Sequence, residues 1–169
     1  MLENRNSEVA DSVTLRGWFE MVVINPDGTV REVREVKNTV VNAGRAQVAG
    51  FINSAVSVTS SGVGSMRFLA IGSATSATGV TDTTMGIEFS SNGGARLVAT
   101  SLTRVTTSVT NDTAQNVLTF TCSAGTLAVG EAAIFDASSG GNMLSRQPFA
   151  VINLTSGDSL QTTWKMQVS

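Results

Sequence analysis

The most constraining feature of this sequence is the even spacing of its turn signals. Toward the C-terminus, the runs 129–137, 143–152 and 159–168 are rich in apolar and β-branched residues, and the polar, glycine-containing segments 138–142 and 153–158 separate them. Turns about every ten residues are typical of antiparallel sheets in a sandwich or barrel, and not of βαβ units. The spacing therefore predicts a mainly β protein.

The first half of the chain continues this pattern and then changes period once. Residues 13–24 alternate apolar and polar side chains as a half-buried strand does, and the turn sequence at 25–28 leads into a returning strand at 29–37. Three valines spaced three apart in the returning segment would also fit a helix. Residues 38–55 are alanine-rich with helical spacing, which predicts a helix with Asn42 as its N-cap.

Further strands are predicted at 66–72, 95–110 and 115–123, so that the chain has about eight strands and one helix. This count predicts an antiparallel two-sheet β-sandwich, jelly-roll-like, with one short α-helix. The length of 169 residues fits one domain. We expect an extended N-terminal arm at 1–12 and a single sandwich domain at 13–169.

The composition excludes several kinds of chemistry. There is no histidine, which removes the commonest general base and metal ligand, and the one cysteine, Cys122, lies in an apolar run where we expect it to be buried. A net charge of −2 does not resemble the basic surface of a nucleic-acid-binding protein. The first twelve residues lack the apolar core of a signal peptide, and no stretch is long enough to span a bilayer, so we expect synthesis in the cytoplasm and no membrane partner.

Two carboxylates, a glycine pair and an arginine occur together in residues 131–146, which suggests either an active-site loop or a turn. Alternation along a strand places Glu131 and Asp136 on opposite faces, unlike the paired carboxylates of a glycosidase. We therefore predict a turn in which Asp136 accepts hydrogen bonds from backbone amides, with left-handed conformations at Gly140, Gly141 and Asn142.

Other candidate sites are also expected to be structural. The glycines at 62 and 64 lack the strand-to-helix context of a phosphate loop. Asp82 and Glu88 could supply oxygen ligands to calcium, but without a calcium-loop spacing they are expected to be solvated. Trp164 could stack on a ligand, but its alternation with Thr162 and Met166 predicts a core position. We predict no catalytic residue, no cofactor and no metal.

The aperiodic segment 73–86 and the low charge point instead to contacts with other proteins. Charged residues make up 14% of the chain, against about 25% in typical soluble proteins. Long structureless loops in compact domains are usually functional or contact-forming. We expect the chain to be completed by neighbouring subunits.

The order of segments resembles a group of small virion proteins of tailed bacteriophages. The likeness follows "KNTVVNAGRAQVAGFIN", "RFLAIGSATSATGVTDTTMGIEF", a threonine- and valine-rich strand pair, "GEAAIFDASSGGNMLSRQPF" and "SGDSLQTTWKMQV", over roughly residues 13–168. The resemblance implies a non-enzymatic structural part of a virus particle. That group includes both capsid decoration (cement) proteins and tail-fibre or baseplate proteins.

Sequence features favour the cement role. The chain has no repeats or heptads of a fibre shaft and no room for a second, receptor-binding domain. A tail-fibre or baseplate role is the alternative, and a glycan-acting tail enzyme is a third hypothesis. The cement role implies location in the virion, with the major capsid protein and other copies of the chain, in a dimer or trimer, as partners, and no nucleic acid, membrane or small-molecule substrate. The predicted contact residues are Leu2, Val9, Ser73, Thr75, Thr78, Asp82 and Thr84.

Overall fold

The computed structural model describes residues 14–45, 48 and 65–168. The predicted arm at 1–12 and the glycines at 62 and 64 lie outside these residues. The described residues form ten strands: β1 (Leu15–Ile24), β2 (Val30–Lys37), β3 (Thr39–Val40), β4 (Phe68–Gly72), β5 (Leu97–Val98), β6 (Ser101–Val105), β7 (Thr113–Thr121), β8 (Thr126–Phe135), β9 (Met143–Thr155) and β10 (Ser159–Val168).

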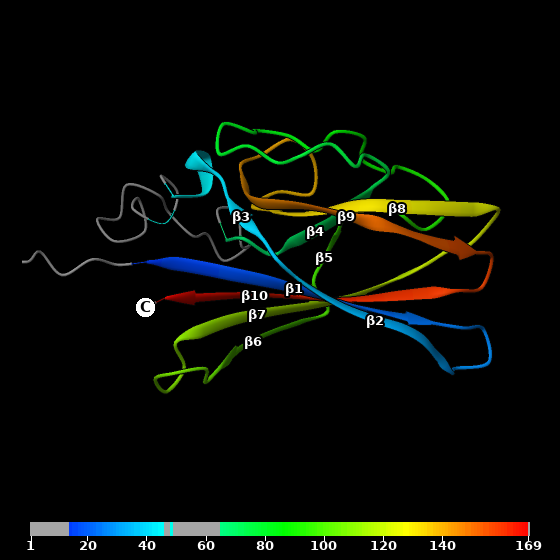
Figure 1. Ribbon diagram of the computed structural model, residues 1–169, viewed down its shortest axis with the longest axis horizontal. Coiled ribbons are helices and arrows are strands. Elements are labelled where there is room, and N and C mark those ends of the chain that lie inside the picture. Colours follow the sequence, from blue (N-terminus) through cyan, green and yellow to red (C-terminus); the bar gives the residue numbers. More distant parts are fainter. Residues whose placement is uncertain (1–13, 46–47, 49–64, 169) are drawn as a thin grey trace, which may run out of the picture.

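The strands form two sheets of five strands that pack face to face (Figure 1). Sheet I has the order β2-β1-β10-β7-β6, and sheet II has the order β3-β9-β8-β4-β5. Every pairing is antiparallel, and the first long strand lies beside the last, from Leu15 opposite Val168 to Ile24 opposite Ser159. The predicted two-sheet sandwich is confirmed.

The two strands beyond the expected eight are both two residues long and lie where the chain changes sheet. β3 follows Asn38, at the point where the chain leaves sheet I, and pairs with β9 through Thr39 opposite Arg146. β5 belongs to sheet II and is separated by two residues from β6 of sheet I. Such short strands carry too little alternation to be recognised in the sequence.

The hairpin of β1 and β2 resolves the ambiguous valine spacing. Gly28 takes a φ of 85° in the predicted turn, as glycine readily does, and β2 returns beside β1. Val33 lies opposite Val22 and is 60% exposed, whereas Val36 lies opposite the buried Phe19. Valines spaced by three residues therefore fall on both faces of a strand.

The helix begins at the expected place, but its cap is not Asn42. Residues 42–45 and 48 are helical, and the carbonyl of Val41 accepts the first helical hydrogen bond from the amide of Arg45 at 3.1 Å. Val41 is therefore the N-cap, and Asn42 is the first helical residue. The amide of Asn42 instead donates to the carbonyl of Val80 at 2.8 Å. Burial of Val41 in the interior sets the start of the helix one residue earlier than the polar side chain indicates.

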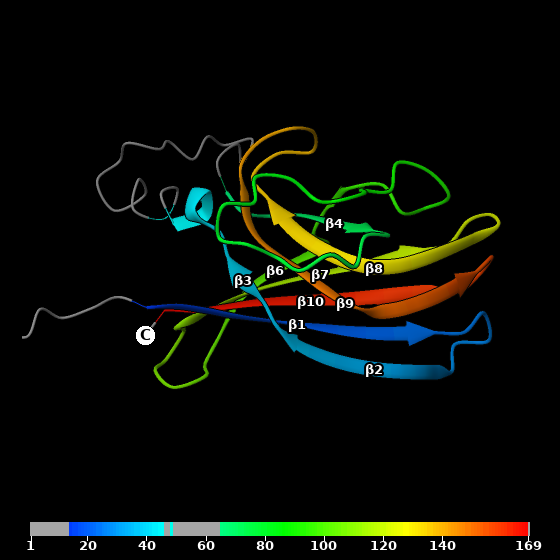
Figure 2. The same cartoon turned by 45° about the horizontal axis from the view of Figure 1, so that its top comes forward.

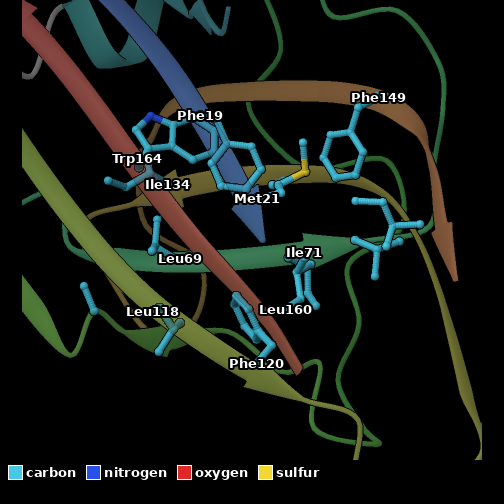
Figure 3. Packing of buried hydrophobic residues seen from close by; sticks show 14 of the residues in the cluster. Phe19, Met21, Leu69, Ile71, Leu118, Phe120, Ile134, Phe149, Leu160 and Trp164 are labelled. Carbon is cyan, nitrogen blue, oxygen red and sulfur yellow. The ribbon is translucent and has the colours of Figure 1, made fainter. Parts of the chain in front are cut away.

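Aromatic side chains from both sheets form the centre of the sandwich (Figure 3). The ring of Phe19 lies 4.6 Å from that of Trp164 and 6.1 Å from that of Phe149, measured between centroids. Trp164 and Cys122 are buried, as predicted. The indole N–H of Trp164 donates to the side-chain oxygen of Asn38 at 2.7 Å, which ties the core to the crossover between the sheets.

Two turns are held by aspartates whose carboxylates accept backbone N–H groups. Asp112 accepts the amides of Val109 at 3.0 Å and of residues 107 and 108 at 2.9 Å, and these bonds lower the pKa of its carboxyl well below the ordinary range. Asp158 accepts the amide of Thr155 at 2.8 Å and a side-chain hydrogen bond from Arg31 at 2.9 Å, and its pKa is lowered mainly by the amide of Thr155.

These lowered pKa values predict acid sensitivity. In the unfolded chain both carboxyls bind a proton near pH 4, and in the folded chain they do so only at lower pH, so their stabilisation is present above about pH 4 and is lost as the pH falls. Asp112→Asn is expected to lower the free energy of unfolding at neutral pH. In this variant the free energy of unfolding should also decrease less between about pH 5 and pH 2 than it does in the unaltered chain. Urea unfolding across this pH range tests the prediction, and an unchanged pH dependence would contradict it.

Candidate functional site

The long aperiodic segment forms a cover over the outer face of sheet II. We call residues 73–96, which join β4 to β5, the cover loop; Figure 2 shows this loop lying across β8 and β9. Its Met85 is buried on that face. The second apolar cluster that the loop helps to form consists of Val41, Ala70, Met85, Ala133, Phe135 and Met143. This sheet is therefore buried on both sides along part of its area.

Glu131 anchors the cover loop from the sheet. It lies on β8 on the same face as Ala133, and its side chain is 0% exposed. Its Oε1 accepts the amide of Ile87 at 2.7 Å, and its Oε2 accepts the amide of Gly86 at 3.2 Å. The carboxylate thus satisfies two backbone donors of the loop that would otherwise be without partners near the sheet.

Arg146 on the neighbouring strand β9 completes the anchor. Its Nε donates to Oε2 of Glu131 at 2.5 Å, and its Nη1 donates to Oδ2 of Asp82 at 3.0 Å. Its Nη2 reaches the carbonyl and the hydroxyl of Ser76 at 3.3 and 3.2 Å. Burial acts to lower the pKa of Arg146, but the hydrogen bonds and charges of Glu131 and Asp82 outweigh burial and raise it. The guanidinium is therefore a permanent cation that joins three separate parts of the chain.

This arrangement is an internal anchor rather than a reactive site. Both oxygens of Glu131 are occupied by donors from the protein, and the side chain has no contact with solvent. A general acid or base needs to reach a proton on a substrate. Glu131 and Asp136 also bind different partners.

Asp136 holds the turn that follows β8, as predicted. Its Oδ1 accepts the amide of Asn142 at 2.7 Å, and its Oδ2 accepts the side-chain amide of the same residue at 3.0 Å. Gly140 and Gly141 have φ values of 59° and 72°, in the left-handed region. The predicted left-handed conformation of Asn142 is wrong, because Asn142 already pairs with Asp136 through its backbone carbonyl as β9 begins.

A second arginine secures the other end of the cover loop. Arg96 donates to both carboxylate oxygens of Glu88, at 2.8 and 2.6 Å, and to the carbonyls of Ala137 and Gly140 at 3.1 and 2.8 Å. Its guanidinium carbon lies 3.5 Å from the centroid of the Phe135 ring. The loop is thus attached to sheet II near both of its ends.

The two carboxylates considered as calcium ligands are both engaged by these arginines. Asp82 pairs with Arg146, and Glu88 pairs with Arg96. Among the described residues there is no group of three or more acidic, cysteine or histidine side chains that could hold a metal ion. The carboxylates of the cover loop thus serve to attach the loop to the sheet.

The predicted contact residues of this loop differ in how they are presented. Thr75 and Thr84 are exposed, and Ser73 is half-buried. Thr78 is half-buried, with its Oγ1 lacking a hydrogen-bond partner, and Asp82 is turned toward Arg146. Leu2 and Val9 lie outside the described residues.

Sequence reasoning did not assign a role to Arg146. A signal was available, since the hairpin of β8 and β9 places Ala133 opposite Arg146, so that Arg146 and Glu131 are diagonal neighbours of opposite charge on one face. The partners in the cover loop could not be inferred in the same way. Asp82 is separated from Arg146 by 64 positions and no regular pairing relates them.

Comparison with known proteins adds no assignment to this geometry. No protein-family model matches the chain, and no curated protein matches its sequence. Within the described ranges, no helix has the length and apolar character needed to cross a membrane.

Proposed function

We propose that this chain is a non-enzymatic structural protein of a tailed-phage particle, and that it acts as a capsid decoration (cement) protein on the major capsid shell. The resemblance described above suggests the particle. The observation that carries the proposal is that, among the described residues, a long loop covers the outer face of sheet II, whereas the outer face of sheet I has only the turn at 106–112 against one end.

The outer face of sheet I is the open one among the described residues (Figure 1). The cross-strand row that runs over all five strands contains no buried residue and consists of Lys37, Trp18, Lys165, Gln115 and Thr103. Three of its five side chains are uncharged, and one of these, Trp18, is of the aromatic type that protein interfaces favour. The proposal assigns this side of the sandwich to contacts among particle subunits.

The cover loop supplies a second contact surface on the opposite side. Because Arg146 and Arg96 already attach it to sheet II, the loop presents Thr75 and Thr84 in a fixed arrangement. A contact surface that is ordered beforehand loses less conformational entropy on binding. Binding only to the assembled shell would raise shell stability as the concentration of the free chain rises above its dissociation constant.

Imaging of whole particles with a tag on this chain tests the location directly. If the chain is a cement protein, we expect the tags over the head and binding of the purified chain to expanded shells. Tags at the tail tip, together with binding to host cells, would favour the fibre or baseplate role instead. Release of reducing ends from host polysaccharide would contradict a structural role.

The predicted contact residues can be tested by substitution. Thr75→Asp with Thr84→Asp is expected to lower shell occupancy about tenfold or more, because two unpaired charges would have to be desolvated at the contact. Occupancy of expanded shells is measured by sedimentation with a dilution series. Ser156→Asp, at an exposed position of the turn between β9 and β10, adds the same charge outside both proposed contact surfaces and serves as the control. Equal occupancy for the loop variant and the unaltered chain would exclude the loop from the contact.

A further inference from the structure

A cleft lies at the corner where the chain passes from sheet I to sheet II. It has a volume of about 590 Å³ and is formed by the start of β1, the end of β2, the crossover at Asn38 and the first turn of the helix. Its walls include Leu15, Arg16, Trp18, Lys37, Thr39 and Arg45. The cleft is therefore lined by three cationic side chains and one aromatic ring.

These three cations have no ionic partner among the described residues. The ion pairs of the structure use other arginines, namely Arg31, Arg34, Arg96 and Arg146. Arg16, Lys37 and Arg45 are all exposed.

Two further groups on the same face affect the charge around the cleft. The amine of Lys165 lies 5.9 Å from the centroid of the Trp18 ring, which adds a fourth cation beside the cleft. Of the carboxylates near this face, Glu20 and Glu35 form the next cross-strand pair, and Asp112 accepts a hydrogen bond at 3.0 Å from Gln167 of the cleft wall; none of the three lines the cleft itself. The cleft therefore has a local excess of positive charge that suits an acidic ligand.

The complementary charge is found in the N-terminal segment of the chain. Residues 1–13 carry three acidic residues, Glu3, Glu8 and Asp11, and one basic residue, Arg5. The rest of the chain has ten acidic and ten basic residues, so the whole net charge of −2 comes from the first thirteen. A neutral sandwich with a basic cleft is thus joined to an acidic segment.

We propose that the cleft of one copy binds the acidic N-terminal segment, residues 1–13, of a second copy. Leu15 and Arg16 form part of the cleft wall, so a segment entering its own cleft would have to reverse direction directly before β1. The segment of a neighbour can enter without this reversal. The inference goes beyond the proposed function and does not rest on it, since association between copies is measured without shells.

Zero-length cross-linking of the full-length chain tests this interaction. A carbodiimide joins a lysine amine to a carboxylate in contact with it, and the chain has only two lysines, Lys37 and Lys165. In an equal mixture of ¹⁴N and ¹⁵N chains, we expect cross-links from Lys37 to Glu3, Glu8 or Asp11, with the two peptides often carrying different isotopes. Lys37→Arg should remove these cross-links and leave association intact, because it keeps the charge but not the reactive amine.

Association itself provides the second readout. Lys37→Glu is expected to weaken association about tenfold in sedimentation equilibrium, and rising salt should weaken that of the unaltered chain. Arg104→Glu, at an exposed position of β6, is the matched charge reversal and should leave association unchanged. Cross-links confined to one isotope would place the segment in its own cleft and overturn the proposal. The proposal would also be overturned if the full-length chain stays monomeric, or if Lys37→Glu leaves the association constant unchanged.

Discussion

Replacing Arg146 with alanine is expected to lower the free energy of unfolding by about 3–5 kcal/mol, because the substitution leaves the carboxylate of Glu131 buried without its cation. The Glu131 side chain is 0% exposed and that of Arg146 is 4% exposed, so solvent cannot compensate for the lost pair. Urea unfolding at neutral pH measures the loss. The backbone amides of Gly86 and Ile87 should also exchange hydrogen faster than those of the sheet, since their acceptor would be displaced.

A second variant separates the broken ion pair from lost packing. Replacing both members of the pair, with Glu131→Leu and Arg146→Met, removes the unpaired charge and is expected to recover much of the stability. Arg104→Ala removes an exposed arginine and should change the free energy of unfolding by less than about 0.5 kcal/mol. A loss below about 1 kcal/mol for Arg146→Ala would show that the anchor contributes no more than a surface pair.

Trp164→Ala is expected to cost about 3–5 kcal/mol of unfolding free energy, since it empties the centre of the sandwich. The residue is 1% exposed and its ring packs on that of Phe19. The substitution also leaves the side-chain oxygen of Asn38 without its indole donor. Thermal and urea unfolding measure the effect.

The chain contains a matched control for this variant, because it has two tryptophans. Trp18 lies on the outer face of sheet I, is half-buried and contacts Lys165. Trp18→Ala should cost about 1 kcal/mol or less. Equal losses for the two variants would contradict the assignment of Trp164 to the core.

The predictable part of this fold was the set of long strands separated by glycine-containing turns. The run that became β1 alternates apolar and polar residues, the runs that became β8, β9 and β10 are rich in apolar and β-branched residues, and the turns between the runs contain glycine, so that local and long-range preferences agree. The cap of the helix was placed one residue late, because burial of Val41 outweighed the capping preference of Asn42.

The anchor of the cover loop was the unpredictable part. Arg146 was visible as a charge in a β-rich segment, but its contacts with Ser76 and Asp82 depend on where an aperiodic loop lies in space. Periodicity describes regular elements only, and a loop without it gives no register from which to infer partners. The contact residues proposed for the particle stay predictions.

The double attachment of the cover loop has a consequence for how such a chain can diverge. Between the residues that Arg146 holds, the stretch of Val80 and Thr81 is exposed, and Val80 is 44% exposed. Substitutions confined to that stretch would leave both apolar clusters and the charge anchor untouched. Under the proposed cement role, one frame would in this way keep its shape while the outward stretch adapts to a different shell surface.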